Sequence, residues 1–432
     1  MTYTLLASGV VGEPGPTYAS PYTDPFGNAA TAILSDGSFF VANWVEDFRP
    51  GNLDYGVLRL WRLDKTMVEL GRADITWPVP AAGTENVPHP YAIGIGGMKV
   101  LLIRSLYRSV GTIYGTFIVD CSGNVPVVGP EVSFDGSNQP TYGGSDSPIS
   151  IYDQGTDRVL VACWSPTVGN LLQVFRGSTG VLLSEHFPGA TRSNIGLHMD
   201  PADHTKFTLS TDRSQHLFTI ALDGLTGSYD GAPEGYTTSD WIVAATSPYV
   251  KSGLIVEVSG SPMNSIHYRD LAGADLVPAV PESTDGYTVM WQGWGSLGAR
   301  QEHGLYYYEM GHSNTTAPYY ENSNEGRLVA IDNSGATPVM EVLALPYFGV
   351  PPVDTVTLSV GSTTISADPV SGLILIATTL LSRVYDYPVQ VGGGTRQYPG
   401  SYFYTTLAWA IQGPSMTPNL TGQLLEDRVR FT

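Results

Sequence analysis

Lysine is scarce in this sequence of 432 residues, and basic side chains are few altogether. Lysine and arginine together number 21 against 40 aspartate and glutamate residues, which gives a formal net charge of −19 at pH 7. Nucleic acids and anionic membranes are bound by clusters of basic side chains. The composition therefore argues against both as partners, and it suits solubility, cations or a basic protein surface.

Cysteine is also rare, and long apolar runs are missing. Cys121 falls at a predicted turn and Cys163 inside an apolar strand, so we expect two buried free thiols rather than a disulfide. No segment approaches the roughly 18 apolar residues of a membrane span. The N-terminal MTYTLLASGVVGEPG lacks a basic region and a full apolar region, so we expect no secretory signal and synthesis in the cytoplasm.

The motifs of common enzyme classes are missing too. No G-x-S-x-G elbow and no H-E-x-x-H motif occurs. Residues 293–298 match G-x-G-x-x-G, but a strand is predicted after them, where a dinucleotide site needs a helix. The Ser-x-Asp-x-Gly-x-Thr-Trp box of sialidases is absent, and no Gly-His/Trp-Asp pair recurs as it does in WD repeats. We therefore expect no catalytic residues, no cofactor and no enzymatic activity.

Two polar segments contain side chains that can bind metals. His198, Asp200, Asp203 and His204 lie close together in the sequence, and residues 135–147 offer oxygens to calcium. The first segment is typical of a hairpin turn, where Asp and Pro occur for conformational reasons. The second lacks the ligand spacing of an EF-hand loop. We predict no metal site from either.

What the sequence does contain is a repeated set of short strands, clearest at residues 149–185. Four apolar runs, each too short for a helix, are separated there by turns rich in Gly, Asp and Ser. The first hairpin of this antiparallel meander returns seven times, marked by turn residues Gly37, Gly97, Asp157, His204, Gly253, Gly304 and Gly372.

A unit of four short strands that recurs every 40 to 60 residues or so is typical of a β-propeller. We predict an all-β fold, a seven-bladed β-propeller of four-stranded antiparallel blades, with residues 1–432 as a single domain. A β-sandwich or a pair of all-β domains is the alternative, because alternating strands and glycine turns suit those folds as well.

A propeller ring needs its last blade tied to its first. Residues 3–11 have the pattern of a strand and resemble the fourth strands of the repeats, so we expect them beside the strands of residues 401–411. The C-terminal GQLLEDRVRFT also alternates like a strand and competes for this role.

Long segments rich in Tyr, Asn, Pro and Gly connect the strands, and such residues suit a contact surface. Three of these segments, expected on one face of the ring, span residues 45–56, 311–326 and 382–400. Three others, expected on the opposite face, span residues 12–30, 77–90 and 346–362. The alternative is that all six are ordinary solvated turns.

The densest group of aromatic residues is the predicted contact surface. It consists of Trp291, Trp294, Tyr306, Tyr307, Tyr308, Tyr319 and Tyr320. Three consecutive tyrosines must point to both faces of a strand, so at least one faces away from its blade. These rings suit a stacking platform for sugar or an anchor for a protein. Packing between blades is the structural alternative.

In repeat and composition, though in no specific motif, the chain resembles β-rich virion proteins of tailed bacteriophages, some of which contain β-propellers. The resemblance implies a non-enzymatic tail or capsid-associated protein, oligomeric in the particle and located in the virion. Its partners would be other virion proteins. The alternative function is a carbohydrate-binding or carbohydrate-active propeller that recognises a host surface glycan. Such a protein would be a lectin or a glycan hydrolase or lyase. A third alternative is an intracellular scaffold that binds a peptide.

Overall fold

The computed structural model describes most strands of the chain and many of its turns. The described residues are 3–12, 29–46, 56–76, 87–107, 112–142, 148–188, 194–200, 202–211, 215–223, 226–229, 234–236, 240–246, 253–258, 264–281, 288–291, 303–311, 325–332, 336–346, 355–368, 371–385 and 400–413. All regular elements in these ranges are strands. Within them, no helix is long and apolar enough to cross a membrane.

The described strands form seven antiparallel sheets, each a meander of at least four strands. The first three sheets contain β2 (Ala30–Ile33), β3 (Phe39–Glu46), β4 (Gly56–Leu63) and β5 (Glu69–Thr76); β6 (Val87–Gly94), β7 (Lys99–Tyr107), β8 (Ile113–Asp120), β9 (Val127–Val128) and β10 (Val132–Phe134); and β11 (Ile149–Asp153), β12 (Arg158–Ser165), β13 (Gly169–Arg176) and β14 (Leu182–His186).

The other four sheets follow the same pattern. They contain β15 (Asn194–Met199), β16 (Lys206–Thr211), β17 (Gln215–Asp223), β18 (Thr226–Tyr229) and β19 (Glu234–Tyr236); β20 (Trp241–Ala245), β21 (Leu254–Val258), β22 (Ser265–Arg269) and β23 (Val280–Pro281); β24 (Thr288–Trp291), β25 (His303–Gly311), β26 (Glu325–Asp332) and β27 (Val339–Pro346); and β28 (Thr355–Ala367), β29 (Leu373–Tyr385), β30 (Gly400–Gln412) and β1 (Thr4–Val11).

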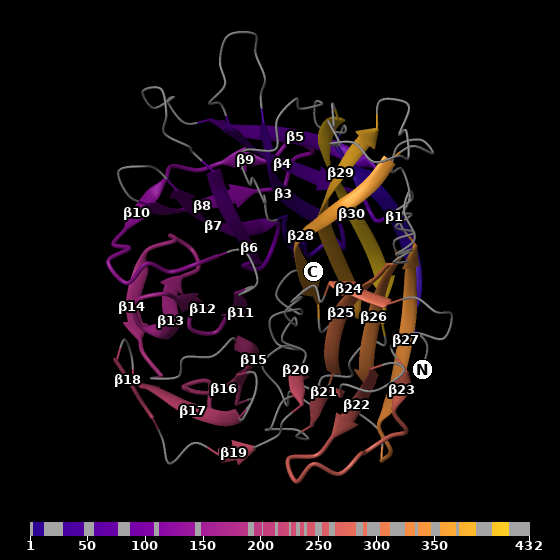
Figure 1. Cartoon of the computed structure of the whole chain (residues 1–432). Helices are drawn as coiled ribbons and strands as arrows, with labels where there is room; N and C mark the ends of the chain where they lie inside the picture. The colour runs from indigo at the N-terminus through magenta and orange to yellow at the C-terminus, as the bar shows by residue number, and fades with distance from the viewer. Residues whose placement is uncertain are drawn as a thin grey trace, which may run out of the picture.

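The sheets are arranged side by side around a common centre, in chain order (Figure 1). Buried apolar clusters join one sheet to the next: Leu60 packs in one cluster with Leu102, and Ile103 packs in another with Val161. The innermost strands β15 and β20 also contact each other. Four-stranded antiparallel sheets that pack on their neighbours around a centre define a β-propeller. The prediction of an all-β propeller is confirmed.

Burial within a blade explains the sequence pattern that made the strands recognisable. A middle strand is covered by a neighbouring blade on each face, so β12 (RVLVACWS) is almost entirely buried and reads as a continuous apolar run. An outermost strand has one face toward solvent, and β1 accordingly alternates between exposed and half-buried residues.

The longest connections gather at one edge of the blades, although short turns such as 166–168 also lie there. At the other edge, short turns such as 34–38, 64–68 and 154–157 join the strands. The strand register shows that both sets of long segments start at the edge with the long connections. Gly56 pairs with Glu46, and Val57 pairs with Thr76, so segments 47–55 and 77–86 leave the same end of one blade. The predicted placement on opposite faces is therefore wrong, because in a meander the second turn and the exit to the next blade share an edge.

The last sheet combines both ends of the chain. β1 pairs with β30 in antiparallel register from Thr4 opposite Gln412 to Val11 opposite Thr406. The backbone N–H of Tyr3, just before β1, donates to Glu341 Oε2 at 2.9 Å, which also ties this strand to the neighbouring sheet. The C-terminal segment that competes for this role lies outside the described residues.

Side-chain hydroxyl groups join this last sheet to the first. Thr31 Oγ1 lies 2.8 Å from Ser366 Oγ, and Thr364 Oγ1 donates to the carbonyl oxygen of Ala29 at 2.7 Å. Deeper in the seam, Asn43 Nδ2 donates to Thr379 Oγ1 at 2.8 Å and to Thr406 Oγ1 at 2.6 Å. This polar seam lies beside an apolar cluster that also spans the two sheets.

Candidate functional site

Part of the predicted aromatic contact surface lies on two neighbouring strands of one blade. Trp291 ends β24 and pairs with Glu309 of β25. Tyr306, Tyr307 and Tyr308 lie in β25, opposite residues 329, 328 and 327 of β26. Trp294, Tyr319 and Tyr320 lie outside the described residues, so the role of the whole group stays a prediction.

Aspartates in the hairpin turns have structural partners. Asp64 Oδ1 accepts from the backbone N–H groups of Thr66 and Val68 at 2.8 and 3.0 Å, and Asp120 Oδ1 accepts from that of Ser122 at 2.8 Å. Such side-chain caps stabilise tight turns. Hydrogen bonds from the turn lower the pKa of Asp64 and Asp120, because each of them favours the carboxylate.

Aspartates of the two segments with metal-capable side chains make the same kind of turn contact. Asp203 Oδ1 accepts from Thr205 Oγ1 at 2.6 Å, and Asp135 Oδ1 accepts from the N–H of Ser137 at 2.9 Å. His204 Nδ1 lies 3.2 Å from Asp153 Oδ1, across the boundary between two blades. Among the described residues, no three His, Cys, Asp or Glu side chains are grouped so that they could hold a metal ion.

Burial shifts the pKa of several titratable groups. Cys121 and Cys163 are fully buried and unbridged, which confirms the expectation of free thiols. Burial raises the pKa of Cys121 to about 12, so this thiol stays protonated and inert. His198 is 3% exposed, and burial lowers its pKa to about 4, so its imidazole is neutral at pH 7.

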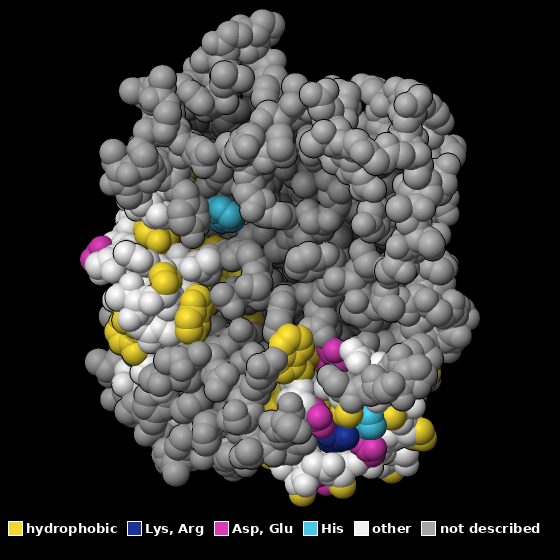
Figure 2. Space-filling model, viewed as in Figure 1, with side chains coloured by type: hydrophobic (Ala, Val, Ile, Leu, Met, Phe, Trp, Pro, Cys, Tyr) yellow, Lys and Arg dark blue, Asp and Glu magenta, His cyan; other side chains and the backbone are white. Residues whose placement is uncertain are grey.

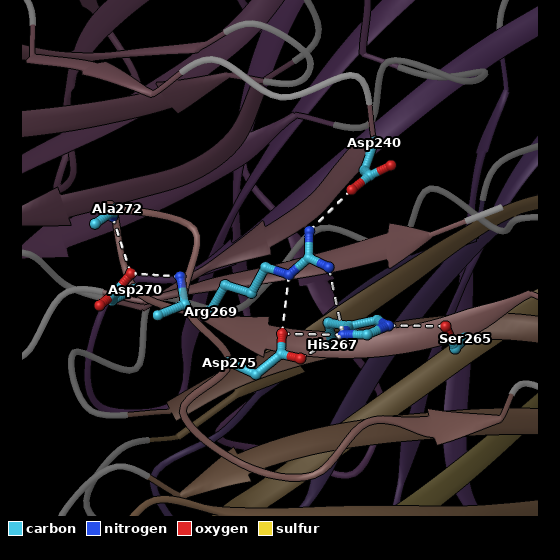
Figure 3. A network of polar contacts seen from close by, with 8 residues as sticks. Asp240, Ser265, His267, Arg269, Asp270, Ala272 and Asp275 are labelled. Carbon is cyan, nitrogen blue, oxygen red and sulfur yellow. Dashed lines mark hydrogen bonds and ion pairs between the residues drawn. The ribbon is translucent and has the colours of Figure 1, made fainter.

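A network of polar side chains lies on β22 and the turn after it. Alternation along the strand places Ser265, His267 and Arg269 on one face, while Ile266 and Tyr268 on the other face are buried in the core. Figure 3 shows Arg269 and His267 directed toward Asp275, with Ser265 on the opposite side of the His267 ring. On the surface of this blade, basic, acidic and His side chains gather (Figure 2).

An aspartate-capped turn brings the carboxylate into place. Asp270 Oδ1 accepts from the N–H groups of Ala272 and Ala274, both at 2.9 Å, and this turn returns the chain toward β22. Asp275 then forms an isolated bridge with Arg269, so its side chain lies beside those of the strand. Local turn chemistry, rather than a long-range contact, fixes this carboxylate.

The network contains a hydroxyl, an imidazole and a carboxylate in line. Ser265 Oγ lies 2.8 Å from His267 Nε2, and His267 Nδ1 lies 3.0 and 3.1 Å from the two oxygens of Asp275. Arg269 Nε donates to Asp275 Oδ1 at 2.9 Å, and its Nη1 donates to Asp240 Oδ2 at 2.8 Å. Partial burial would raise the pKa of Asp275, but the hydrogen bonds from Arg269 and His267 outweigh it and lower this pKa.

Sequence patterns alone do not reveal this group. A serine two residues before a histidine is a weak signal, and it occurs again at Ser184 and His186, where Ser184 Oγ lies 3.0 Å from His186 Nε2. The third member, Asp275, is identified only once the turn at residues 270–274 is known. The sequence does show that Ser265 and His267 lie on one face of a strand, because side chains alternate between the two faces.

Comparisons with known proteins give no family. No protein-family model and no curated protein matches the sequence. Among solved structures, the chain is similar to Raptor of Chaetomium thermophilum, with 11% identity and a TM-score of 0.44 over 96% of this chain and 30% of that chain. It is similar to the WD40 domain of Toxoplasma gondii coronin, with 9% identity and a TM-score of 0.40 over 96% of this chain and 89% of that one.

A third similar structure is the β-propeller domain of the Trilobed protease from Pyrococcus furiosus. Identity there is 10% and the TM-score 0.39, over 83% of this chain and 95% of that chain. Likenesses at this level carry no argument about function. The chain is a β-propeller on the evidence of its own sheets.

Proposed function

We propose that this protein is a non-enzymatic β-propeller scaffold that binds other proteins through the edge of the ring that carries its long connections. The observation that supports the proposal is the difference between the two edges. At one edge, short turns are held by aspartate caps such as those of Asp64 and Asp120. At the other edge, connections such as residues 12–29 and 386–399 join the strands. Binding residues in proteins concentrate on loops that a rigid scaffold positions.

The scaffold would be one closed ring. In this proposal all seven sheets are equivalent blades of a single domain over residues 1–432, and the pairing of β1 with β30 closes it. The hydrogen bonds of Asn43 to Thr379 and Thr406 support closure, because they join the first and last blades directly. A strand donated from the other end of the chain removes the open seam that a ring of repeats would otherwise have.

The finer proposal is that the scaffold is a tail or capsid-associated component of a bacteriophage particle. Composition and repeat alone support it: an acidic chain of net charge −19, two cysteines and long connections rich in Tyr, Asn, Gly and Pro. Its partners would be neighbouring virion proteins and other copies of this chain, with the aromatic group around Trp291 as one contact.

Size-exclusion chromatography with light scattering on the purified chain, followed by a glycan array on the same sample, tests the proposal. We expect an oligomer that binds no glycan. Replacing residues 313–323 by a short Asn-Gly turn should reduce the oligomer to a monomer, whereas the matched control Thr66→Ala at the opposite edge should not. A monomer that binds a defined glycan would contradict the scaffold and favour the carbohydrate-binding alternative.

A further inference from the structure

We propose that Ser265 is an acylatable nucleophile, activated by His267 and Asp275, that reacts with small activated acyl esters. A nucleophile within hydrogen-bond distance of a base, with the base held by a third group, is the arrangement that makes a serine reactive. Here the two distances are 2.8 Å from Ser265 Oγ to His267 Nε2 and 3.0 Å from His267 Nδ1 to Asp275 Oδ1. This slow reactivity of one serine goes beyond the scaffold function proposed above, whose protein binding itself needs no catalysis.

The neighbours of the imidazole determine which nitrogen carries its proton. Both oxygens of Asp275 lie near His267 Nδ1, and an ionised carboxylate can only accept hydrogen bonds. Nδ1 must therefore carry the proton of the neutral ring. Nε2 is then the acceptor, so the hydroxyl of Ser265 donates to it. This is the tautomer in which a histidine can take the proton of a serine as general base.

The ring is held in place and remains in reach of small molecules. Ser265 is half-buried, and the His267 side chain is 14% exposed. Arg269 fixes Asp275 from the other side and is itself held by Asp240. Its guanidinium also competes with the imidazole for the carboxylate, because it donates to Asp275 Oδ1, and its Nη2 lies 3.5 Å from His267 Nδ1. We therefore expect slow chemistry.

The reaction would proceed in two balanced steps. In the first, Ser265 Oγ forms a bond to the carbonyl carbon of the ester, and its proton passes to His267 Nε2. The bond from that carbon to the leaving oxygen breaks, and the alcohol leaves with the proton from Nε2. In the second step, water attacks the acyl-serine, gives one proton to Nε2, and releases the acid as Ser265 recovers its proton.

The chain provides its own control. Ser184 and His186 repeat the serine-to-histidine contact at 3.0 Å on another blade. The environment of His186 Nδ1 is different, because the backbone at Gly227 approaches it closely. Burial lowers the pKa of His186, which makes that imidazole a poorer base, although the nearby Glu185 raises it. A reaction that needs the carboxylate should therefore occur at Ser265 and not at Ser184.

The test is incubation of the full chain with p-nitrophenyl acetate and, separately, with a fluorophosphonate probe, followed by peptide mass mapping. We expect one acetyl or phosphonyl group on Ser265, formed slowly. Ser265→Ala should abolish labelling, and Ser184→Ala should leave it unchanged. Modification of another residue, or labelling that survives Ser265→Ala, would overturn the proposal.

A second variant tests whether Asp275 is needed to activate Ser265, without disturbing the fold. Asp275→Asn keeps the shape of the side chain, but its amide can donate to Nδ1 and so favours the inactive tautomer. We expect loss of most of the acylation rate and of its dependence on pH near neutrality, with an unchanged circular dichroism spectrum. If Asp275→Asn reacts at the wild-type rate with the same pH profile, the carboxylate has no positioning role and the proposal fails.

Discussion

Asn43 offers the sharpest test of how the first and last blades are joined. Its side chain is 3% exposed and donates to the hydroxyls of Thr379 and Thr406 at 2.8 and 2.6 Å. Asn43→Ala removes both bonds and leaves two buried hydroxyl groups without this donor. Each net hydrogen bond contributes about 1 kcal/mol, and an unsatisfied buried group costs about 1–3 kcal/mol. We therefore expect a loss of about 2–4 kcal/mol in the free energy of unfolding.

The expected shift in Tm follows from the size of the chain. The entropy of unfolding is about 2.1 cal/mol/K per residue, or about 0.9 kcal/mol/K for 432 residues. A loss of 2–4 kcal/mol should thus lower Tm by roughly 2–4 °C, measured by scanning calorimetry at fixed protein concentration.

A triple variant that removes the donor and both acceptors tests whether the loss of stability comes from the broken hydrogen bonds. Replacing a donor and its acceptors together by apolar groups of similar shape is nearly neutral, because no buried polar group is left without a partner. The triple variant Asn43→Leu, Thr379→Val, Thr406→Val should therefore recover most of the loss. An Asn43→Ala variant as stable as the wild type, or a triple variant no better than the single one, would refute the hydrogen-bonded seam.

Two further predictions concern the ends of the chain and its pH dependence. Deleting residues 1–11 removes β1 and its pairing with β30, so Tm should fall sharply, and an unchanged Tm would show that this strand does not hold the last blade. His198 has its folded pKa lowered to about 4 from 6.5, so the unfolded chain binds more protons between these values, and stability should be lost as pH falls from about 6.5 to 4. His198→Phe should flatten that slope by up to roughly 3 kcal/mol over the window, measured by denaturant unfolding at each pH, and an equal slope in both proteins would contradict the buried neutral imidazole.

The blades could be predicted from the sequence because each strand is a short apolar run that ends at recognisable turn residues. In the meander at residues 149–185, buried runs such as β12 end at turns whose residues have clear conformational roles. Asp157 and Gly180 adopt positive φ angles of 54° and 71°, which Gly and Asp tolerate best. The sequence pattern also predicts a turn at Gly304, but this residue lies inside β25 rather than in a turn.

What the sequence did not reveal depends on how strands meet in space. From the sequence, the long segments are expected on two opposite faces of the ring. The length and composition of a segment do not show which end of a blade it leaves. The register of Val57 with Thr76 supplies that information. In the same way, Asp275 joins Ser265 and His267 only through the fold of the turn that Asp270 caps. Chemistry assembled from three chain positions is invisible to a search for contiguous motifs.

The proposed scaffold requires a ring closed by the chain's own N-terminal strand, which joins the last blade through the pairing of β1 with β30. Ala7 and Ala410 face each other across β1 and β30, and both contact the same apolar cluster. The two native thiols are buried, so oxidation of the variant Ala7→Cys, Ala410→Cys should form one new disulfide. We predict a monomeric cross-link between residues 7 and 410 by peptide mapping, together with a higher Tm. Failure to cross-link, or a bridge only between two copies, would contradict closure within one chain.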